Sequence, residues 1–456
     1  MIHGPFVYSR YCRCLLLLML ACSIVFGPAA ASERPGKPFV VLISIDGLKP
    51  EAILDAASHG LKVPNLRAFL ADGVYSTGVH GVLPTLTYPS HMTILTGTSP
   101  AKHGIYSNTT FDPLRRNEHG WYWYTEDVKV STLWDAATAA HLTTANVYWP
   151  TSVAANITYN LPQIWRTGTA DDLKLQRALS TPGLERELSA GVGRYPGGMD
   201  ETVADDEIRA RFAIRLIETK HPNFITVYFT GLDSEEHDSG PFSAKANEVL
   251  ERIDTIIGTL RAAIEHAAHG RGTICVVSDH GFAAVEHDVN LYSAFLQAGL
   301  FTVDKANKVS SWKSMPWPAG GGAAVMLADP TMRAQVSDLL NALASDPANG
   351  IDRIMTHEEL VQARGFPDAD FFVSFKIGYE FGDSFSPPLV SPPSHLGMHG
   401  YVPDRPEMKS SFFLIGPHVP AGRSLGEIDM RQIAPTLASI LHVSLKDAEL
   451  GPLQLN

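Results

Sequence analysis

The sequence predicts an α/β fold with a mostly parallel central sheet and helices on both of its faces. Three short runs rich in β-branched and aromatic residues have the composition of buried strands. They are Val40–Ile45, Phe224–Phe229 and Thr273–Val277. Helix-like runs alternate with them, which is the pattern of parallel α/β sheets. An aspartate comes shortly after each strand, and in such sheets ligands bind beyond the carboxyl ends of the strands. We therefore expect a functional site at this edge.

The helices predicted between these strands follow in order along the chain. Pro50–Gly60 and Val63–Asp72 come after the first strand. Asp205–Lys220 carries an apolar stripe and leads into the second strand. Ala244–His266 has apolar residues at helical spacing and leads into the third strand. Ala145–Trp149 is a further short strand, so the order is strand, helix, strand, helix, strand.

The chain between about residues 295 and 385 breaks this alternation. Within it, Trp317–Gly322 is predicted to be a loop because it combines proline with three glycines. The core pattern resumes with a strand at Ser411–Ile415 and a helix at Asp429–Leu441. We predict one large domain over residues 32–456, with a small subdomain inserted at about 295–385.

Residues 1–31 have the pattern of an export signal peptide. Two arginines precede an apolar run, and Ala29-Ala30-Ala31 then offers a small-residue cleavage site. The apolar run is too short to span a bilayer comfortably, so we expect no transmembrane span in the mature chain. Cys22 would allow a lipoprotein anchor, but the residues around it fit that pattern poorly. The predicted location is the periplasm or the outside of the cell, with cleavage near Ala31.

The composition limits the classes of partner. The chain has 36 Lys and Arg residues against 48 Asp and Glu, a formal charge of −12. This charge disfavours nucleic-acid binding. It does not exclude phosphate substrates, because bound divalent cations would add positive charge to a site rich in carboxylates. Cys275 is the one cysteine outside the predicted leader, so we expect no intrachain disulfide.

Metal-ligand residue types gather at the predicted strand ends. Asp46 follows the first strand, Asp233 and His237 the second, and Asp279 and His280 the third. Asp233 and His237 are four residues apart, so a helical turn would place them on one face. Taken alone, Asp46 could simply cap a turn, and each of the two pairs could be an ordinary surface pair instead of a set of metal ligands. Imidazole and carboxylate are good ligands for divalent metals, and their common position at three strand ends favours one metal site in an enzyme.

A hydroxyl and an amide side chain stand out in the segment after the first strand. Thr87 precedes an apolar, helix-like run at Met92–Leu95. A hydroxyl at a helix N-terminus lies among positive backbone dipoles and can cap the helix, and the local sequence favours that structural role. Asn108 taken alone could be an ordinary turn residue instead of a functional one.

Ordered motifs run along nearly the whole mature chain. They are Val41–Gly47, Thr87–His91, Thr96-Gly97, His103-Gly104-Ile105, Trp149-Pro150, Asp233 with His237, Ser278–Gly281, Gly397–Gly400 and Ile428–Thr436. In this order they resemble the alkaline phosphatase superfamily and, within it, the nucleotide pyrophosphatase/phosphodiesterase family. The resemblance implies an alkaline-phosphatase-like fold and the catalytic core alone. Ser90 departs from the pattern, because many family members have asparagine there.

The resemblance also implies two zinc ions per chain, other divalent metals being the alternative. It implies that one zinc is held by Asp233, His237 and His399, and the other by Asp46, Asp279 and His280. It further implies that Thr87 binds the second zinc as the nucleophile and that Asn108 binds a phosphoryl oxygen. By the same resemblance, phosphodiester or phosphoanhydride bonds would be hydrolysed through a covalent phosphothreonine. Two metal ions could stabilise both the attacking and the leaving oxygen of such a displacement.

The residues near Trp149-Pro150 bear on the class of substrate. Monoesterases of the superfamily typically add a lysine and arginine pair for the extra phosphate charge, whereas Thr151–Asn156 contains no cation. This favours a diester or a nucleotide as the small-molecule substrate. Tyr88 and Trp149 are predicted to contact it by stacking. The cluster Trp121–Tyr124 is a further candidate, and ordinary aromatic packing is the alternative for all of these residues.

Three other functions stay open at this point. A phosphomonoesterase or a phosphonate hydrolase could use the same metal core. The third alternative is a non-catalytic exported protein whose metal is structural. Such a protein would need no reactive hydroxyl at Thr87. A sulfatase is disfavoured, because Cys275 lies inside a strand and lacks the motif needed for formylglycine. The sequence does not determine whether the natural substrate is a nucleotide, a lipid-headgroup diester or a phosphonate, nor does it determine the metal or the oligomeric state.

Overall fold

The centre of the fold is an eight-stranded sheet. The computed structural model describes Met1 and residues 37–117, 120–164, 170–197 and 201–455. The predicted signal peptide, residues 1–31, lies outside the described residues apart from Met1. Residues 38–456 form one compact unit, to which all of the following refers.

Five neighbouring strands of the central sheet are parallel to one another. The order across the sheet is β19 (Arg423–Ser424), β2 (Val74–Tyr75), β18 (Phe412–Ile415), β7 (Thr273–Val277), β1 (Val40–Ile45), β6 (Phe224–Phe229), β4 (Thr144–Val147) and β5 (Tyr159–Leu161). The strands from β7 to β5 pair in parallel, and β18 runs antiparallel to both of its neighbours. The predicted mostly parallel α/β sheet is confirmed.

The register of the central strands brings three chain segments to one edge. Ile45 at the end of β1 pairs with Phe229 at the end of β6, and Ser44 pairs with Val277 at the end of β7. All residues of these three strands are buried. Such strands are typical of a parallel sheet covered on both faces. The chain therefore leaves all three strands at the same level.

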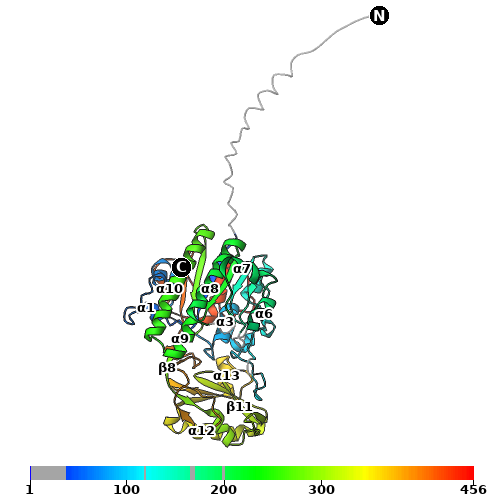
Figure 1. Ribbon diagram of the computed structural model, residues 1–456, viewed down its shortest axis with the longest axis vertical. Coiled ribbons are helices and arrows are strands. Elements are labelled where there is room, and N and C mark those ends of the chain that lie inside the picture. The colour runs from blue at the N-terminus through cyan, green and yellow to red at the C-terminus, as the bar shows by residue number, and fades with distance from the viewer. Residues whose placement is uncertain (2–36, 118–119, 165–169, 198–200, 456) are drawn as a thin grey trace. The chain divides into compact units, whose positions relative to one another are not determined.

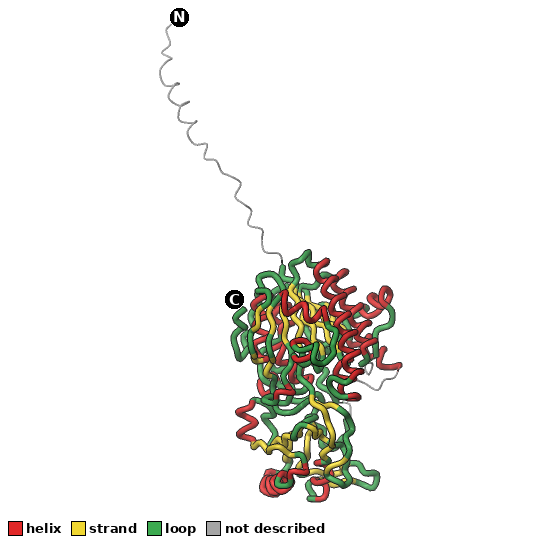
Figure 2. The backbone as a smooth tube through the Cα atoms, turned by 90° about the vertical axis from the view of Figure 1, so that its left-hand side faces the viewer, coloured by secondary structure: helices red, strands yellow, loops and turns green. Residues whose placement is uncertain are grey.

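Two groups of helices cover the sheet. One group is α2 (Pro64–Asp72), α8 (Val203–Lys220) and α10 (Ala244–Ala267), which pack on one another and on β18, β6 and β4. The other group is α3 (Thr87–Thr96), α5 (Leu133–Ala139) and α14 (Ile433–Leu441), which pack on one another and on β1 and β4. Figure 2 shows the yellow strands between the red helices. Further helices are α1 (Glu51–Leu54), α4 (Pro100–His103), α6 (Ala170–Leu179), α7 (Leu184–Val192) and α9 (Gly231–Ser239).

The chain between β8 (Ala283–Val289) and β17 (Gly397–Met398) builds smaller sheets with a hydrophobic cluster of their own. An antiparallel sheet has the order β11 (Ser314–Pro318), β12 (Gly322–Leu327), β14 (Phe371–Phe375) and β13 (Ile351–Thr356). The other elements are α11 (Leu291–Gln297), β9 (Phe301–Val303), β10 (Val309–Trp312), α12 (Arg333–Ala344), α13 (His357–Ala363), β15 (Gly378–Phe381) and β16 (Val390–Ser391). Figure 1 shows β11, α12 and α13 together, below the central sheet.

This second cluster includes Phe295, Val325, Leu340 and Phe375, and is separate from the cluster around the central sheet. The division of the chain into a main domain and an inserted subdomain at about 295–385 stays a prediction. None of the helices in the described part of the chain is both long and apolar enough to cross a membrane.

Several predicted elements have other bounds in the structure. The strand expected over Ala145–Trp149 is Thr144–Val147, and the α-helix expected over Asp429–Leu441 begins at Ile433. The helix expected over Pro50–Gly60 ends after Leu54 and continues as turns, where the Ser58 hydroxyl donates to the carbonyl of Asp55 at 2.7 Å. Such local bonds compete with helix formation. The loop expected over Trp317–Gly322 begins later, because Trp317 and Pro318 belong to β11. That strand lies at the edge of its sheet, where proline is tolerated.

Candidate active site

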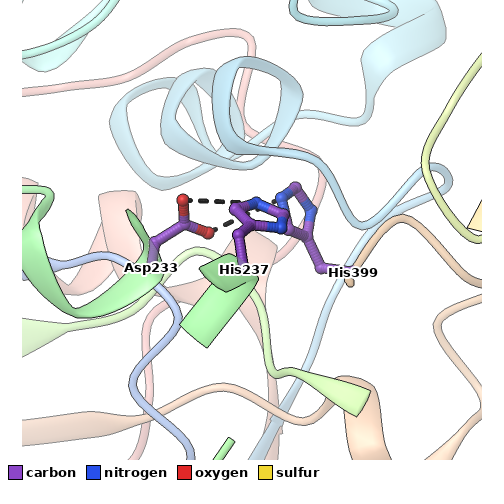
Figure 3. A group of neighbouring side chains, drawn as sticks. All are labelled: Asp233, His237 and His399. Atoms are coloured by element: carbon purple, nitrogen blue, oxygen red, sulfur yellow. Dashed lines mark ion pairs between the residues drawn. The ribbon is translucent and has the colours of Figure 1, made fainter. Parts of the chain in front are cut away.

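The first group of predicted ligands is Asp233, His237 and His399. The helix α9 begins just after β6 and carries Asp233 and His237 one turn apart, as their spacing predicts. Nε2 of His237 lies 3.5 Å from Oδ2 of Asp233, and Nε2 of His399 lies 3.6 Å from Oδ1 of Asp233. Figure 3 shows the carboxylate facing both rings. The three side chains could hold one metal ion.

Backbone carbonyls fix the orientation of both rings in this group. Nδ1 of His237 lies 2.9 Å from the carbonyl of Gly397, and Nδ1 of His399 lies 3.1 Å from the carbonyl of Thr85. A carbonyl can only accept, so each Nδ1 carries the proton and each Nε2 keeps its lone pair. Metal-ligating histidines are commonly oriented in this way.

The second group is Asp46, Asp279 and His280, at the ends of β1 and β7. Nε2 of His280 lies 3.2 Å from Oδ1 of Asp46 and 3.2 Å from Oδ2 of Asp279. Nδ1 of His280 donates to the carbonyl of Gly281 at 3.1 Å. The backbone N–H of Gly47 donates to Oδ1 of Asp279 at 3.3 Å. These three side chains also form a group that could hold a metal ion.

The two groups touch. The rings of His280 and His399 stack with their centroids 3.6 Å apart. Nε2 of His280 also lies 4.0 Å from Oδ1 of Asp233, which belongs to the first group. The six predicted ligands therefore form one continuous centre beyond the carboxyl ends of β1, β6 and β7.

The carboxylates of this centre are short of hydrogen-bond partners. Oδ1 of Asp46, Oδ1 of Asp233 and Oδ2 of Asp279 are buried and accept no hydrogen bond. Burial raises the pKa of Asp46 well above its ordinary value, and the charges of Asp233 and Asp279 raise it further. Burial also raises the pKa of Asp233, and raises that of Asp279 to about 7. Buried carboxylates with unpaired oxygens stay charged only when a cation compensates them, and hold protons otherwise.

The histidines of the centre are suited to the same cation. Burial lowers the pKa of His237 to about 4 and lowers the pKa of His280 and His399 well below the ordinary value. All three rings are then uncharged at neutral pH, which is the form that binds metals. The residues present therefore fit two divalent metal ions, and the mixture of imidazole and carboxylate oxygen is a donor set that suits zinc.

Thr87 lies at this centre and does not cap the helix. It is the first residue of α3, and the capping position is held by Leu86, which makes no side-chain cap bond. The Oγ1 atom of Thr87 lies 3.4 Å from Nε2 of His280. The capping role that the local sequence favours is therefore wrong. The helix begins one residue earlier than that role requires, so the hydroxyl faces the ligand groups.

Asn108 and Tyr88 border the same centre. The backbone N–H of Tyr88 donates to Oδ1 of Asn108 at 2.9 Å, which leaves the Nδ2 amide as the donor end of that side chain. The ring of Tyr88 packs at 5.4 Å from the ring of Trp121, and both residues line the cavity in front of Thr87.

The cavity has a volume of about 450 Å³, within the range of small-molecule sites. Thr87, Asn108, Asp46 and the first ligand group line it, and residues that the sequence analysis missed are Glu201, Glu380, Phe381, His395 and Gly320. His395 donates from Nδ1 to Oε2 of Glu380 at 2.9 Å. No local signal marks Glu380, because it reaches the site through the pairing of β15 with β8.

Trp149 is not brought into this cavity. Its side chain is fully buried and contacts the ring of His91 edge-on, at 4.8 Å between centroids. This contact is the ordinary aromatic packing that is the alternative to stacking on the substrate. His91 itself supports the centre, because its Nδ1 donates to the carbonyl of Thr87 at 2.7 Å and lies 3.5 Å from Oδ2 of Asp279. Tyr228 adds a further contact by donating from its hydroxyl to Oδ2 of Asp46.

The Thr87 hydroxyl lies at a helix N-terminus, between two groups of His and Asp side chains at the edge of a parallel sheet. This arrangement is that of a candidate metallohydrolase. The comparisons with known proteins identify the family. The model of the type I phosphodiesterase/nucleotide pyrophosphatase family matches residues 40–402. The chain belongs to this family, which is part of the alkaline phosphatase superfamily.

Curated relatives are similar over somewhat more than half of the chain. Ectonucleotide pyrophosphatase/phosphodiesterase family member 3 of Mus musculus is 26% identical over 255 residues, which are 54% of this chain and 25% of that protein. Bis(5'-adenosyl)-triphosphatase ENPP4 of Homo sapiens is 24% identical over 288 residues, which are 61% of this chain and 55% of that protein. The chain thus spans between a quarter and about half of the length of these relatives.

A solved structure is similar over almost the whole chain. Murine ectonucleotide pyrophosphatase/phosphodiesterase 5, as an inactive variant in complex with AMP, matches with a TM-score of 0.66 and 19% identity. The match covers 92% of this chain and 98% of that chain. At this level of identity the likeness concerns the fold, which is the alkaline-phosphatase-like fold that the sequence predicts.

Proposed function

We propose that the protein is a two-zinc phosphodiesterase or nucleotide pyrophosphatase that uses Thr87 as its nucleophile. The observation that carries the proposal is the position of the Thr87 hydroxyl, 3.4 Å from Nε2 of His280, between two groups whose buried carboxylate oxygens lack partners. Membership of the family supports the class of reaction.

Asp233, His237 and His399 would hold one metal ion, and Asp46, Asp279 and His280 the other. When bound, the two ions would lower the pKa of the Thr87 hydroxyl and offset the charge of the phosphoryl and leaving oxygens. The protein's own part is to keep the imidazoles uncharged and oriented. Burial keeps the three rings uncharged. The carbonyls of Gly397, Thr85 and Gly281 orient them by accepting from Nδ1 of His237, His399 and His280.

In the proposed reaction, Oγ1 of Thr87 loses its proton to solvent and forms a bond to phosphorus. The bond between phosphorus and the leaving oxygen breaks, and an alcohol, which takes up a proton from solvent, or a phosphate group departs. The oxygen of a water molecule then bonds to phosphorus, the bond from phosphorus to Oγ1 breaks, and a proton from that water restores the hydroxyl. The position of Thr87 at the start of α3 also places the developing charge near the positive end of that helix.

Asn108 has the role of a hydrogen-bond donor to the phosphoryl group. Because its Oδ1 already accepts from the backbone of Tyr88, its Nδ2 is the end that can donate toward the cavity. A fixed donor of this kind stabilises charge on a phosphoryl oxygen as the bond to Thr87 forms. The contact from the start of α3 holds the amide in this orientation.

The charge of the cavity favours a diester substrate over a monoester. Among the described residues that line it there is no lysine or arginine, while Glu201, Asp238 and Glu380 add acidic groups. A dianionic monoester would lack a cationic side chain for its extra oxygen. Tyr88 and Trp121 are the aromatic side chains proposed to contact a nucleobase or another planar group.

The test compares three substrates on the zinc-loaded protein: bis-p-nitrophenyl phosphate, thymidine monophosphate p-nitrophenyl ester and p-nitrophenyl phosphate. Diester rates that exceed the monoester rate by orders of magnitude are expected. Thr87→Ala should fold, bind metal and lose turnover, while Thr87→Ser should keep part of it. Full turnover by Thr87→Ala would refute the nucleophile, and a preference for the monoester would indicate a phosphatase on the same metal core.

We further propose that the protein acts in the periplasm or outside the cell, on the pattern of residues 1–31. N-terminal sequencing of the mature protein from its cellular fraction tests this. A mature N-terminus near Ser32 is expected, and an intact Met1 in the cytoplasm would contradict it.

A further inference from the structure

We propose that the buried ion pair of Asp206 and Arg209 is a positioning device for α9, and that it sets the metal affinity of the group Asp233, His237 and His399. Both residues lie on α8, and neither is part of the cavity. The inference deepens the proposed function. It rests on that function in one respect, namely that a metal ion binds the group Asp233, His237 and His399.

Asp206 supplies the cap that α9 does not have within its own sequence. The backbone N–H of Gly231 donates to Oδ2 of Asp206 at 2.8 Å, and that of Thr230 donates to Oδ1 at 3.2 Å. Thr230 is in the N-cap position of α9 but makes no side-chain cap bond. The first N–H groups of a helix have no partner within it, and a carboxylate there also favours the helix dipole. The start of α9 is therefore tied to α8.

Arg209 holds the carboxylate of Asp206 in place. Its Nη1 donates to Oδ1 of Asp206 at 2.8 Å and to the hydroxyl of Thr230 at 3.0 Å. Its guanidinium also lies over the ring of Tyr148, 3.8 Å from the centroid. Asp206 and Arg209 are both fully buried. The contacts of Arg209 fix the carboxylate in a place where an unpaired charge would be costly.

The approach of α9 to α8 leaves no free space at Gly231. A Cβ atom at this position would lie 2.7 Å from the backbone nitrogen of Val203 and 2.8 Å from Oδ2 of Asp206. Asp233 follows two residues later, in the first turn of α9. A shift of the Asp206 carboxylate would therefore displace Gly231 and, through the first turn of α9, Asp233.

The far end of α9 is tied to the segment that carries the third ligand. The N–H of Leu396 donates to the carbonyl of His237 at 2.8 Å, and Nδ1 of His237 donates to the carbonyl of Gly397 at 2.9 Å. That segment continues into His399. With this end fixed, the bonds from Asp206 determine how α9 is placed along its axis, and so how Asp233 meets the two histidines.

The experiment measures binding of Co²⁺ alone to the metal-free mature protein, by its visible spectrum and by competition with a chelator. The main variant is Asp206→Leu with Arg209→Met, because it removes the cap without leaving a buried charge; Asp206→Asn is the smaller change. Glu207→Gln is the matched control, since Glu207 on the same helix makes a half-exposed ion pair with Arg252 at 2.7 Å. His399→Ala provides the spectrum of a protein that lacks the first group.

The expected result is a loss of affinity of about 10 to 100-fold at the first group, as for supporting contacts of metal ligands, with the second group unchanged. The spectrum at limiting Co²⁺ should approach that of His399→Ala, and Glu207→Gln should match the wild type. Unchanged affinities in a folded double variant, even with a lower unfolding temperature, would overturn the inference. Equal weakening of both groups, or failure of both Asp206 variants to fold, would also overturn it.

This outcome is separable from that of the proposed function. A wild type that hydrolyses diesters while the double variant binds Co²⁺ normally would refute the positioning role alone. A selective loss of Co²⁺ in the variant, with no hydrolysis of any phosphate ester by the zinc-loaded wild type, would refute the proposed function alone.

Discussion

The imidazole ring of His280 stacks on that of His399, with 3.6 Å between centroids and 9° between the ring planes. Two protonated rings could not share this arrangement without strong repulsion. Burial lowers the pKa of both residues, so both rings are uncharged at neutral pH. The protons that the metal-free centre holds are therefore on its carboxylates.

The first prediction is that zinc binding releases protons from these carboxylates. Burial raises the pKa of Asp279 to about 7 and that of Asp46 and Asp233 well above the ordinary value. A raised pKa means that protons compete with the metal, so zinc affinity should increase as the pH rises through about 7. Calorimetry in buffers of different ionisation enthalpy counts the protons. No proton release at pH 7 would contradict these pKa shifts.

The second prediction concerns Asn108. Asn108→Ala should lower kcat by about 10²- to 10³-fold on a diester while changing KM little, because a fixed donor to developing charge is lost. Steady-state kinetics with bis-p-nitrophenyl phosphate measures this. Asn108→Asp is the control for shape: it still accepts from the N–H of Tyr88 but has no amide donor, so its kcat should fall as well. A normal kcat in either variant would exclude the donor role.

The third prediction is that Tyr228→Phe weakens the second metal group with little loss of stability. The hydroxyl of Tyr228 donates to Oδ2 of Asp46, and its removal should reduce zinc affinity by about 10 to 100-fold. Tyr148→Phe is the matched control, because it removes a hydroxyl from the neighbouring ring, which stacks on that of Tyr228, and leaves the bond from Tyr228 to Asp46 intact. Equal metal affinity in the wild type and Tyr228→Phe would show that the ring alone supports Asp46.

The fourth prediction separates backbone strain from crowding near His399. Gly320 and Gly299 both have a positive φ, +65° and +68°. A Cβ at Gly320 would lie 2.4 Å from the carbonyl oxygen of His399, whereas nothing lies within 4 Å of one at Gly299. Gly299→Ala should cost about 1–2 kcal/mol of unfolding free energy for the left-handed conformation. Gly320→Ala should cost about 1–3 kcal/mol more for the overlap. Similar unfolding midpoints for the two variants in denaturant would contradict this.

The sequence points to five of the six ligands because they stand near strongly patterned elements. Asp46 directly follows one apolar strand, Asp279 and His280 come just after another, and the four-residue spacing of Asp233 and His237 fits a helix. His399 has no such neighbour, and only the family resemblance points to it. The structure brings all six residues together as two neighbouring groups of three, while their roles as ligands stay predictions.

The parts that the sequence does not predict depend on contacts between distant segments. Glu380 and His395 reach the cavity through the smaller sheets, whose pairing has no short-range signal. Asp206 looks in the sequence like an ordinary charge in the first turn of a helix, and its bonds to Thr230 and Gly231 are formed only when α8 and α9 pack. Trp149 is predicted to contact substrate from its motif, but the local sequence carries no information on its burial.

The origin of the three ligands in the first group has a consequence for how the protein matures. Leu232, beside Asp233, packs in the hydrophobic cluster of the central sheet, whereas Met398, beside His399, packs in the cluster of the smaller sheets. Neither cluster contains the complete ligand set. We therefore expect the group to be complete only once both clusters have folded and packed together, so that a metal ion binding there would bind late in folding rather than nucleate it.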